Sequence, residues 1–388
     1  MSLRPPSRYD LAVVGAGIIG LATALAAARR GLSVVVIDRD ALANGASVRN
    51  FGFVTVSGQE RGLMWARARR SRDVWVEVAA AAGVPVVHTG AWVCARRPES
   101  AAVLAAFMAG DMADDCALLD TGEARRRFPQ LQTTGLTAVL ESRVELRVES
   151  REAIPRLASW LAAAHGVTIL RNTAVQRIEL PGVITARGVI AADRVAVCPG
   201  DDFSSLYPER IGAYPVTRCK LQMLRLAAPG FRLPAALLSD LSLARYGGYA
   251  VLEPARALKA RLAVEQPECL ANGVHLIVVQ SADGTLVVGD SHHYAATPDP
   301  FSRSDVDALI LEEFCAALGI EPPPVVERWT GTYASATDRP VLIDAPEPRV
   351  RIAIVTSGAG ASCGFAIGEE VVADLFGEPA PRHVTGAA

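Results

Sequence analysis

The first residues whose types and spacing could serve chemistry are three glycines near the start of the chain. Gly15, Gly17 and Gly20 form a G-x-G-x-x-G turn between a short apolar, strand-like run and an Ala- and Leu-rich stretch that predicts a helix. In this context the first glycine permits a tight turn, the second lets backbone approach a pyrophosphate, and the third lets helix and strand pack closely. The helix start would offer free N–H groups and the positive end of its dipole to phosphates.

An aspartate closes the second strand-like run of the same unit. Asp38 follows Gly20 by eighteen residues, which places its carboxylate where a ribose diol would donate hydrogen bonds. The uncharged stretch Leu11–Ala28 could also be a signal peptide or a membrane span. We favour a strand–turn–helix–strand unit, because glycines at this spacing serve no purpose in a span and a strand ending in an acid follows. This unit alone does not distinguish NAD from FAD.

The bulk composition favours a soluble globular chain of two domains. Its 388 residues exceed one ordinary core, and 51% of them are hydrophobic against 21% charged. The formal net charge of −2 gives no reason to expect binding to nucleic acid or to an anionic membrane. The seven cysteines are widely spaced and contain no C-x-x-C. We therefore expect neither a disulfide framework nor a metal site, and reduced thiols favour the cytoplasm.

Two further glycine-rich segments could face the same nucleotide. Residues 44–52 follow the acidic end of the second strand and are too polar for a strand, so they form either a surface turn or a wall beside the nucleotide. Near the other end, an apolar strand over Val350–Val355 leads through Ser357–Gly364 into a helix that ends at Phe376. A glycine-rich helix start there would bring a second set of backbone N–H groups to the same ligand.

The middle of the chain divides between two kinds of structure. Residues 150–200, a helix followed by strands that end at Gly200, look like a return to the nucleotide domain. The later part predicts a helix over Ser304–Leu318 with Ser304 as N-cap. It also predicts strands that favour a second, antiparallel domain, at residues 214–226, 248–252, 274–280 and 285–289.

Four motifs, in this order, resemble those of the D-amino-acid oxidase, glycine oxidase and sarcosine oxidase family of FAD enzymes: GAGIIG with Asp38, GASVRN, ADRVAVCPG and SGAGASCG. The resemblance covers nearly the whole chain. It implies an α/β fold, with a doubly wound, Rossmann-like FAD-binding domain and an α+β substrate domain built on a mostly antiparallel sheet. The FAD-binding domain would comprise residues 1–85, 142–213 and 330–388, and the substrate domain residues 86–141 and 214–329.

The resemblance also implies which residues hold FAD. Backbone groups of the two glycine-rich turns would meet the pyrophosphate and the pyrimidine side of the isoalloxazine, where N–H donors stabilise negative charge on the reduced ring. Asp38 would bind the adenosine ribose, with Arg39 and the backbone of Val175 at the adenine. The full set is Gly15, Gly17, Gly20, Asp38, Arg39, Ser47, Arg49, Asn50, Val175, Gly200, Ser357, Gly358, Gly360 and Ser362.

The segment Gly331–Asp338 departs from the family. Amino-acid-oxidising members carry an arginine there, in G-x-R-P-x-T-x-D, that holds the substrate carboxylate as a bidentate fork; here Tyr333 takes that position. The cysteine that links the flavin in sarcosine oxidase would fall near Gly331 and is absent, so we expect non-covalent FAD. The lysine used there for oxygen activation would fall near Val287, so the electron acceptor, oxygen or another, stays open.

Two short stretches, Arg49–Gly52 and Gly289–Tyr294, resemble FAD oxidoreductases found with aminophosphonate-catabolism genes. This resemblance implies a substrate such as 2-aminoethylphosphonate or its N-methyl form. A dianionic head group needs several cationic or N–H donors, and the candidates that could bind or orient the substrate are Arg218, Lys220, Arg245, His292, His293 and Tyr333. Alternatively, the two histidines form a solvated turn, Lys220 points to the outer face of a sheet, and Tyr333 only packs against the flavin.

These features favour an oxidoreductase that acts on the C–N bond of a small amine. A hydride would pass from carbon to flavin N5 and leave an imine, which water hydrolyses to a carbonyl product. Such a reaction needs no strong general base, and the sequence shows no obvious pair of histidine and carboxylate. A 2-hydroxy acid is an alternative substrate for the same hydride geometry. A flavin-fold protein that binds the nucleotide without turnover is a second alternative.

Overall fold

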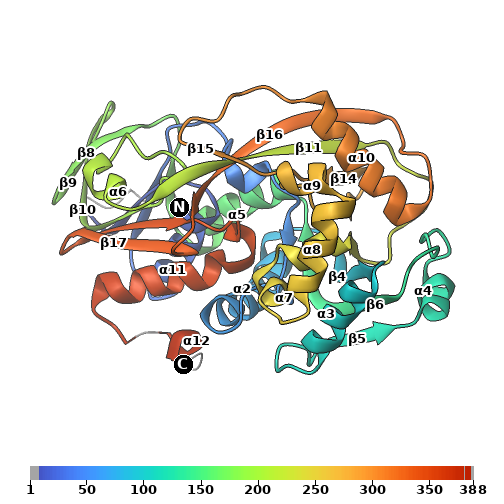
Figure 1. Ribbon diagram of the computed structural model, residues 1–388. Coiled ribbons are helices and arrows are strands. Elements are labelled where there is room, and N and C mark those ends of the chain that lie inside the picture. Colours follow the sequence, from blue (N-terminus) through green and yellow to red (C-terminus); the bar gives the residue numbers. More distant parts are fainter. Residues whose placement is uncertain (1–7, 380, 386–388) are drawn as a thin grey trace.

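The computed structural model describes residues 8–379 and 381–385 as two sheets covered by helices (Figure 1). The first sheet contains β1 (Tyr9–Val14), β2 (Val34–Ile37), β7 (Thr168–Leu170), β8 (Val175–Glu179), β9 (Gly182–Thr185), β10 (Gly188–Val197), β17 (Val341–Glu347) and β18 (Val350–Val355). Its order is β17-β18-β10-β1-β2-β7, and the hairpin of β8 and β9 extends from β10. All neighbours along this order are parallel except β17 and β18.

The N-terminal unit has the predicted form. Helix α1 (Ile18–Ala28) connects the parallel strands β1 and β2, and β2 ends directly before Asp38. The segment Leu11–Ala28 is therefore a strand, a turn and a helix. Helix α1 is apolar on nearly all sides because it lies against the sheet on one side and against α11 (Gly360–Phe376) on another.

Several polar contacts hold α11 against α2 (Leu63–Ala82), and Figure 1 shows these helices side by side. The Trp75 indole N–H donates to the Ala361 carbonyl at 2.8 Å. The Arg67 guanidinium and the Glu370 carboxylate form a nearly buried ion pair at 2.7 Å. With α5 (Ser150–His165), these helices form the layer that positions both glycine-rich helix starts.

The second sheet is mostly antiparallel. It contains β3 (Phe53–Val54), β4 (Val86–Ala95), β5 (Cys116–Leu119), β6 (Ala138–Val148), β11 (Val216–Leu226), β12 (Ala236–Leu238), β13 (Ile277–Gln280), β14 (Leu286–Gly289), β15 (His293–Ala295) and β16 (Val325–Ala336). Its order is β15-β11-β14-β13-β12-β4-β6-β3, with β16 paired to β11 and β5 to β6; only β4 and β12 are parallel. The fold class predicted from the sequence is confirmed. The domain limits stay a prediction, and β6 and β16 extend across residues 142 and 330.

The remaining elements surround these sheets. They are α3 (Pro98–Met108), α4 (Thr121–Arg127), α6 (Pro208–Gly212), α7 (Gly247–Ala250), α8 (Ala255–Glu265), α9 (Pro267–Ala271), α10 (Ser304–Leu318), α12 (Arg382–Thr385) and the 3₁₀ turns η1 (Ala46–Val48) and η2 (Asp240–Ala244). One hydrophobic core lies within the second sheet and its helices, and two others cover the opposite faces of the first. Among the helices of the described residues, none combines the length and the apolar character that crossing a membrane requires.

Two local predictions were wrong. Residues 248–252 do not form a strand; the chain turns helically in α7 because Gly248 packs on another backbone segment. Its N–H donates to the Gly58 carbonyl at 3.1 Å, and a Cβ there would lie 2.6 Å from the Gln59 carbonyl oxygen. Ser304 is not the N-cap of α10 but its first residue. Arg303 takes the capping position in an extended conformation, since its N–H donates to Gln222 Oε1 at 2.9 Å.

Candidate functional site

A cavity of about 550 Å³ is bordered by residues from both sheets. On one side lie the N-terminal glycine-rich turn, the segment 46–55 and the C-terminal glycine-rich turn 357–362. On the other side lie parts of the second sheet and the residues that precede α7. The two glycine-rich turns, at opposite ends of the sequence, therefore meet at one cavity, as the sequence predicted.

The N-terminal turn depends on glycine for close contacts. Gly15 has a φ of +102°, and a Cβ on it would overlap the Cys198 carbonyl oxygen, while a Cβ on Gly20 would overlap the carbonyl oxygen of Gly15. Gly17 and Gly20 line the cavity. Asp38 lies behind the turn, where its Oδ2 accepts a hydrogen bond from the Ala16 N–H at 2.6 Å. The carboxylate thus supports the turn.

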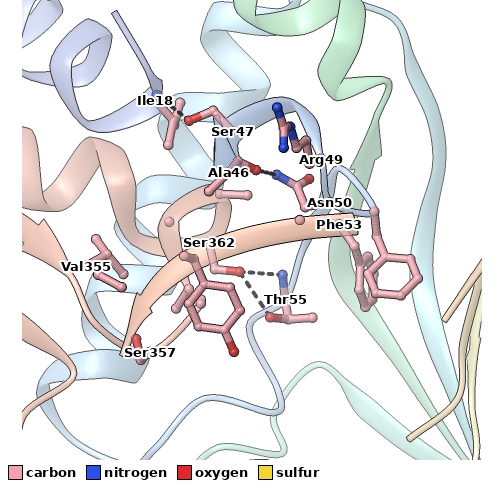
Figure 2. Close-up of a pocket in the computed structure, with 18 of the residues that line it drawn as sticks. Ile18, Ala46, Ser47, Arg49, Asn50, Phe53, Thr55, Val355, Ser357 and Ser362 are labelled. Atoms are coloured by element: carbon pink, nitrogen blue, oxygen red, sulfur yellow. Dashed lines mark hydrogen bonds between the residues drawn. The ribbon is translucent and has the colours of Figure 1, made fainter. Parts of the chain in front are cut away.

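The C-terminal turn is hydrogen-bonded to Thr55, directly after β3 (Figure 2). Ser357, Gly358, Gly360 and Ser362 line the cavity. The Ser362 hydroxyl accepts a hydrogen bond from the Thr55 N–H at 2.9 Å and lies 3.0 Å from the Thr55 hydroxyl. These bonds join parts of the chain that are 307 residues apart.

Residues 46–50 form a wall of the cavity (Figure 2). The Ser47 hydroxyl accepts a hydrogen bond from the Ile18 N–H at the start of α1, at 2.9 Å. The Asn50 amide donates to the Ala46 carbonyl at 2.6 Å, and the Arg49 carbonyl accepts from the Trp329 indole. Ser47, Arg49 and Asn50 all line the cavity. Of the two sequence-based alternatives, these contacts favour a wall over a free surface turn.

Several predicted site residues lie outside the cavity lining. The Lys220 ammonium is bound to the Asp299 carboxylate and the Phe301 carbonyl, both at 2.9 Å, because strand alternation sends Leu221 toward the cavity and Lys220 to the opposite face. His293 hydrogen-bonds Asn272, and Arg218 donates to the carbonyls of Asp201 and Ala296. At the expected adenine end, Arg39 pairs with Asp202, and Val175 packs in β8.

Arg245, His292 and Tyr333 do reach the cavity, and Gly200 borders it as well. Arg245 Nη2 donates to the Tyr294 hydroxyl at 3.0 Å. Among the described residues, no carboxylate lies within ion-pair distance of Arg245, which lines the cavity. Tyr333 lies between His292, at 6.5 Å between ring centroids, and Gly358, where a Cβ would lie 3.1 Å from the phenol ring. Burial holds the Tyr333 pKa well above its usual value, so the phenol is neutral.

Sequence reasoning named His292 but missed the buried group that it forms with His275 and Asp290. Asp290 Oδ1 lies 3.2 Å from His275 Nε2, and its Oδ2 lies 3.7 Å from His292 Nε2. Burial raises the pKa of Asp290 to about 7, against the opposing charge of Arg245. Burial holds the pKa values of both imidazoles well below 6.5, and the positive charge of Arg245 lowers them further. Asp290 stands two residues before His292, but nothing in the sequence indicates that His275 would meet them.

Ligand atoms of this group lie within 4.8 Å of one another, a spacing that a cation could bridge. Arg245 already provides a positive charge close to the carboxylate. We therefore interpret the group through proton chemistry, and the expectation of no metal stays a prediction.

The residues at the cavity fit FAD. Two glycine-rich helix starts, those of α1 and α11, border it and could offer N–H groups to a pyrophosphate, and side chains at Gly15 or Gly20 would clash with neighbouring carbonyl oxygens and distort the first of these turns. The segments at 15–20, 46–50 and 357–362 would hold the cofactor, with the phenol of Tyr333 and the Arg245 side chain beyond them.

Comparisons with known proteins agree with this geometry. A family profile described as FAD dependent oxidoreductase matches residues 10–375. Glycine oxidase from Bacillus cereus ATCC 14579 has a similar structure, with 18% identity, a TM-score of 0.77, and coverage of 97% of this chain and 98% of that one. Iminodiacetate oxidase from Chelativorans sp. BNC1 has 20% identity, a TM-score of 0.73, and coverage of 95% and 96%. L-α-glycerophosphate oxidase from Mycoplasma pneumoniae, solved with FAD bound, has 16% identity, a TM-score of 0.73, and coverage of 95% of both chains.

A search of curated proteins found no match. The structural similarities, at these identities, establish the fold. The family profile spans nearly the whole sequence, from β1 to α11, and includes all three segments that border the cavity on the cofactor side. The chain therefore belongs to the family of FAD-dependent oxidoreductases.

Proposed function

We propose that this enzyme oxidises the C–N bond of a small amine that also carries an anionic group. The observation that supports this most is Arg245, a half-buried guanidinium at the cavity with no carboxylate partner among the described residues. Asp290 lies close enough for its charge to be felt by Arg245. The cavity thus presents a cationic group that suits an anion and, near it, a carboxyl group that suits an ammonium.

Amino-acid-oxidising members of the family carry an arginine at the position in β16 that Tyr333 occupies here, and we propose that Arg245 takes over its role. It comes from a different element, directly after η2, so the anion would be held from another wall of the cavity. A guanidinium with free donors can bind a carboxylate or a phosphonate through two parallel hydrogen bonds. The neutral Tyr333 would form an apolar wall between that anion and the C-terminal glycine-rich turn, and would exclude water from the reacting carbon.

Bound FAD supplies the acceptor for the hydride that leaves the carbon next to nitrogen. The protein's own work is to orient that carbon, hold the anionic head, and keep the nitrogen unprotonated. The electron acceptor that later reoxidises the cofactor, oxygen or another, stays a prediction.

Within this class we propose an aminophosphonate, such as 2-aminoethylphosphonate or its N-methyl form, as the substrate to test first. Tyr246 and Tyr294 stand near Arg245 at the cavity and offer further hydroxyl groups to a dianionic head. Amino acids with a carboxylate head are the natural comparison, because the names of two structural relatives include glycine and iminodiacetate.

A 2-hydroxy acid is a second candidate. The imidazoles of His275 and His292 are neutral and stand beside the cavity, so either could accept the proton of a hydroxyl group. One relative of the same fold is named for a glycerophosphate, an alcohol with an anionic head.

A substrate panel tests the proposal. Purified protein with FAD is mixed anaerobically with aminophosphonates, amino acids, hydroxy acids and uncharged amines, and bleaching of the flavin absorbance is followed. We expect anionic amines to reduce the flavin fastest. Reduction by hydroxy acids alone, or equally by uncharged amines, would contradict the proposal.

The role of Arg245 is tested with Arg245→Met. Removing one partner of a charged pair costs at least about 2 kcal/mol, so the half-saturating amine concentration should rise about 30-fold or more. Arg245→Lys should recover part of this loss. Arg218→Met is the matched control, because Arg218 lies outside the cavity lining, and it should leave the concentration dependence unchanged.

A further inference from the structure

Asp290 is a buried carboxyl group without a hydrogen-bond donor. It is 5% exposed, and neither of its side-chain oxygens accepts a hydrogen bond from another residue within the part of the chain that the structure describes. The 3.2 Å approach of His275 Nε2 lacks hydrogen-bond geometry, and His292 Nε2, at 3.7 Å, is too distant. A buried carboxyl group normally has such partners, so their absence needs an explanation.

The neighbouring imidazoles form no hydrogen bond with Asp290 Oδ1. His292 Nδ1 lies 2.9 Å from the Gly273 carbonyl, which only accepts, so Nδ1 carries the proton and Nε2 has a free lone pair. His275 lies with its Nδ1 3.2 Å from the Ser242 hydroxyl and its Nε2 toward Asp290. His292 therefore presents an acceptor toward Asp290, and His275 presents its Nε2 in a geometry that forms no hydrogen bond.

The charges around Asp290 come from several elements. Its own segment contributes His292, and the segment before β13 contributes His275. Arg245 and Tyr246 approach from the end of η2, and Cys219 approaches from β11. Tyr294 and Tyr333 complete the lining at this end. Arg245 is the one permanent cation of this set, and its hydrogen bond goes to Tyr294.

We propose that Asp290, supported by His275 and His292, removes the ammonium proton of the bound substrate before the hydride leaves. This inference rests on the proposed function and names a catalytic residue for it. An ammonium nitrogen has no lone pair to assist the departing hydride, whereas a neutral amine does. An ammonium group docked at Asp290 would also supply the hydrogen-bond donors that the carboxylate lacks.

The step balances without any redox change. An N–H bond of the substrate breaks, its electron pair stays on nitrogen, and the proton forms an O–H bond on Asp290. Because burial raises its pKa to about 7, Asp290 is a stronger base than an ordinary carboxylate and still ionises at neutral pH.

The test compares wild type, Asp290→Asn and the control Asp307→Asn. Asp307 is equally buried but lies in α10, bound to Gln222 and Arg328. The probe is the amine from the panel that bleaches the flavin fastest, and the rate of anaerobic reduction is measured from pH 5 to 10. In wild type the rate should rise with pH well below the ammonium pKa of that amine. In Asp290→Asn the rate at pH 7 should fall about 100-fold and recover as pH passes the amine's own pKa.

Two further readouts keep the proposal open to refutation. Infrared difference spectra should show a protonated carboxyl band that titrates near pH 7 in wild type and is missing from Asp290→Asn. If that variant does not fold, the wild-type profile decides, because a rise only at the amine's own pKa overturns the proposal. Unchanged kinetics in folded Asp290→Asn overturn it too, as does loss of wild-type activity to a chelator. If no amine bleaches wild type, the proposed function fails first and this inference with it.

Discussion

A methyl group added at Gly368 should push apart α1 and α11, the two helices that follow the glycine-rich turns at the cavity. Gly368 lies in α11 against the backbone of α1, where a Cβ would lie 2.6 Å from the Ala22 carbonyl carbon and 2.7 Å from the Thr23 nitrogen. Gly364, one turn earlier in α11, faces side chains instead. A Cβ there would lie 3.1 Å from Ile18 Cγ1 and 3.4 Å from Ile19 Cδ1.

The expected magnitudes follow from these distances. Alanine in place of glycine favours either helix position by about 1 kcal/mol. At Gly364 the Ile18 side chain can move by a few tenths of an ångström, so stability should stay within about 1 kcal/mol of wild type. At Gly368 the opposing atoms belong to the backbone, and α1 cannot retreat without leaving the sheet. Overpacking typically costs about 1–3 kcal/mol, and this rigid contact belongs at or above the upper end of that range. We expect a net loss of about 2 kcal/mol.

The assay is urea unfolding followed by tryptophan fluorescence, together with the ratio of FAD to protein after purification. Gly368→Ala should unfold at lower urea and retain less FAD, because the starts of α1 and α11 would no longer border one cavity correctly. Gly364→Ala should resemble wild type in both measurements. Wild-type stability and full FAD content in Gly368→Ala would refute the inferred contact between the helices.

Three other outcomes follow from the structure. Gly20→Ala should abolish FAD binding, because a Cβ would overlap the Gly15 carbonyl; a variant with full flavin content would contradict this. Acid precipitation should release FAD into the supernatant, whereas a yellow pellet would indicate a covalent link. Asp290 has a pKa raised from 3.8 to about 7, so the folded state holds its proton more tightly and wild type loses stability as pH rises through this window. Relative to Asp290→Asn, wild type should lose about 2–3 kcal/mol between pH 5 and pH 8, measured by urea unfolding at each pH; a difference independent of pH would contradict the buried charge.

Most of the predicted cofactor-binding segments could be recognised from the sequence, because their conformations depend on residues close to one another along the chain. The turn at Gly15–Gly20 and the following α1 depend on residue types that act on their immediate neighbours. The position of Asp38 at the end of a strand predicts a carboxylate beside a ribose diol. In the structure this carboxylate accepts a hydrogen bond from the Ala16 N–H and so supports the turn. The C-terminal turn at Ser357–Ser362 was recognisable for the same reason, since a strand, glycines and a helix follow one another directly.

The faces of strands were harder to assign. Lys220 and His293 belong to neighbouring strands of the second sheet, in register with each other, and both lie outside the cavity lining. Strand alternation allows either face, and only pairing with β16 and β15 determines that Leu221 meets the cavity and Lys220 does not. The wrong strand at 248–252 has a similar origin, because packing on Gly58 overrides the local pattern.

The sequence by itself determined the strand–turn–helix–strand unit at the N-terminus, because that unit depends on residues that are neighbours along the chain, and four short motifs supplied the resemblance to FAD enzymes. Only the tertiary structure decided which groups face the substrate. His275, Asp290 and Arg245 stand in three separate segments, and their chemistry arises from shared burial beside one cavity. Burial and proximity change the proton affinity of these groups, and neither property can be read from residues taken one at a time.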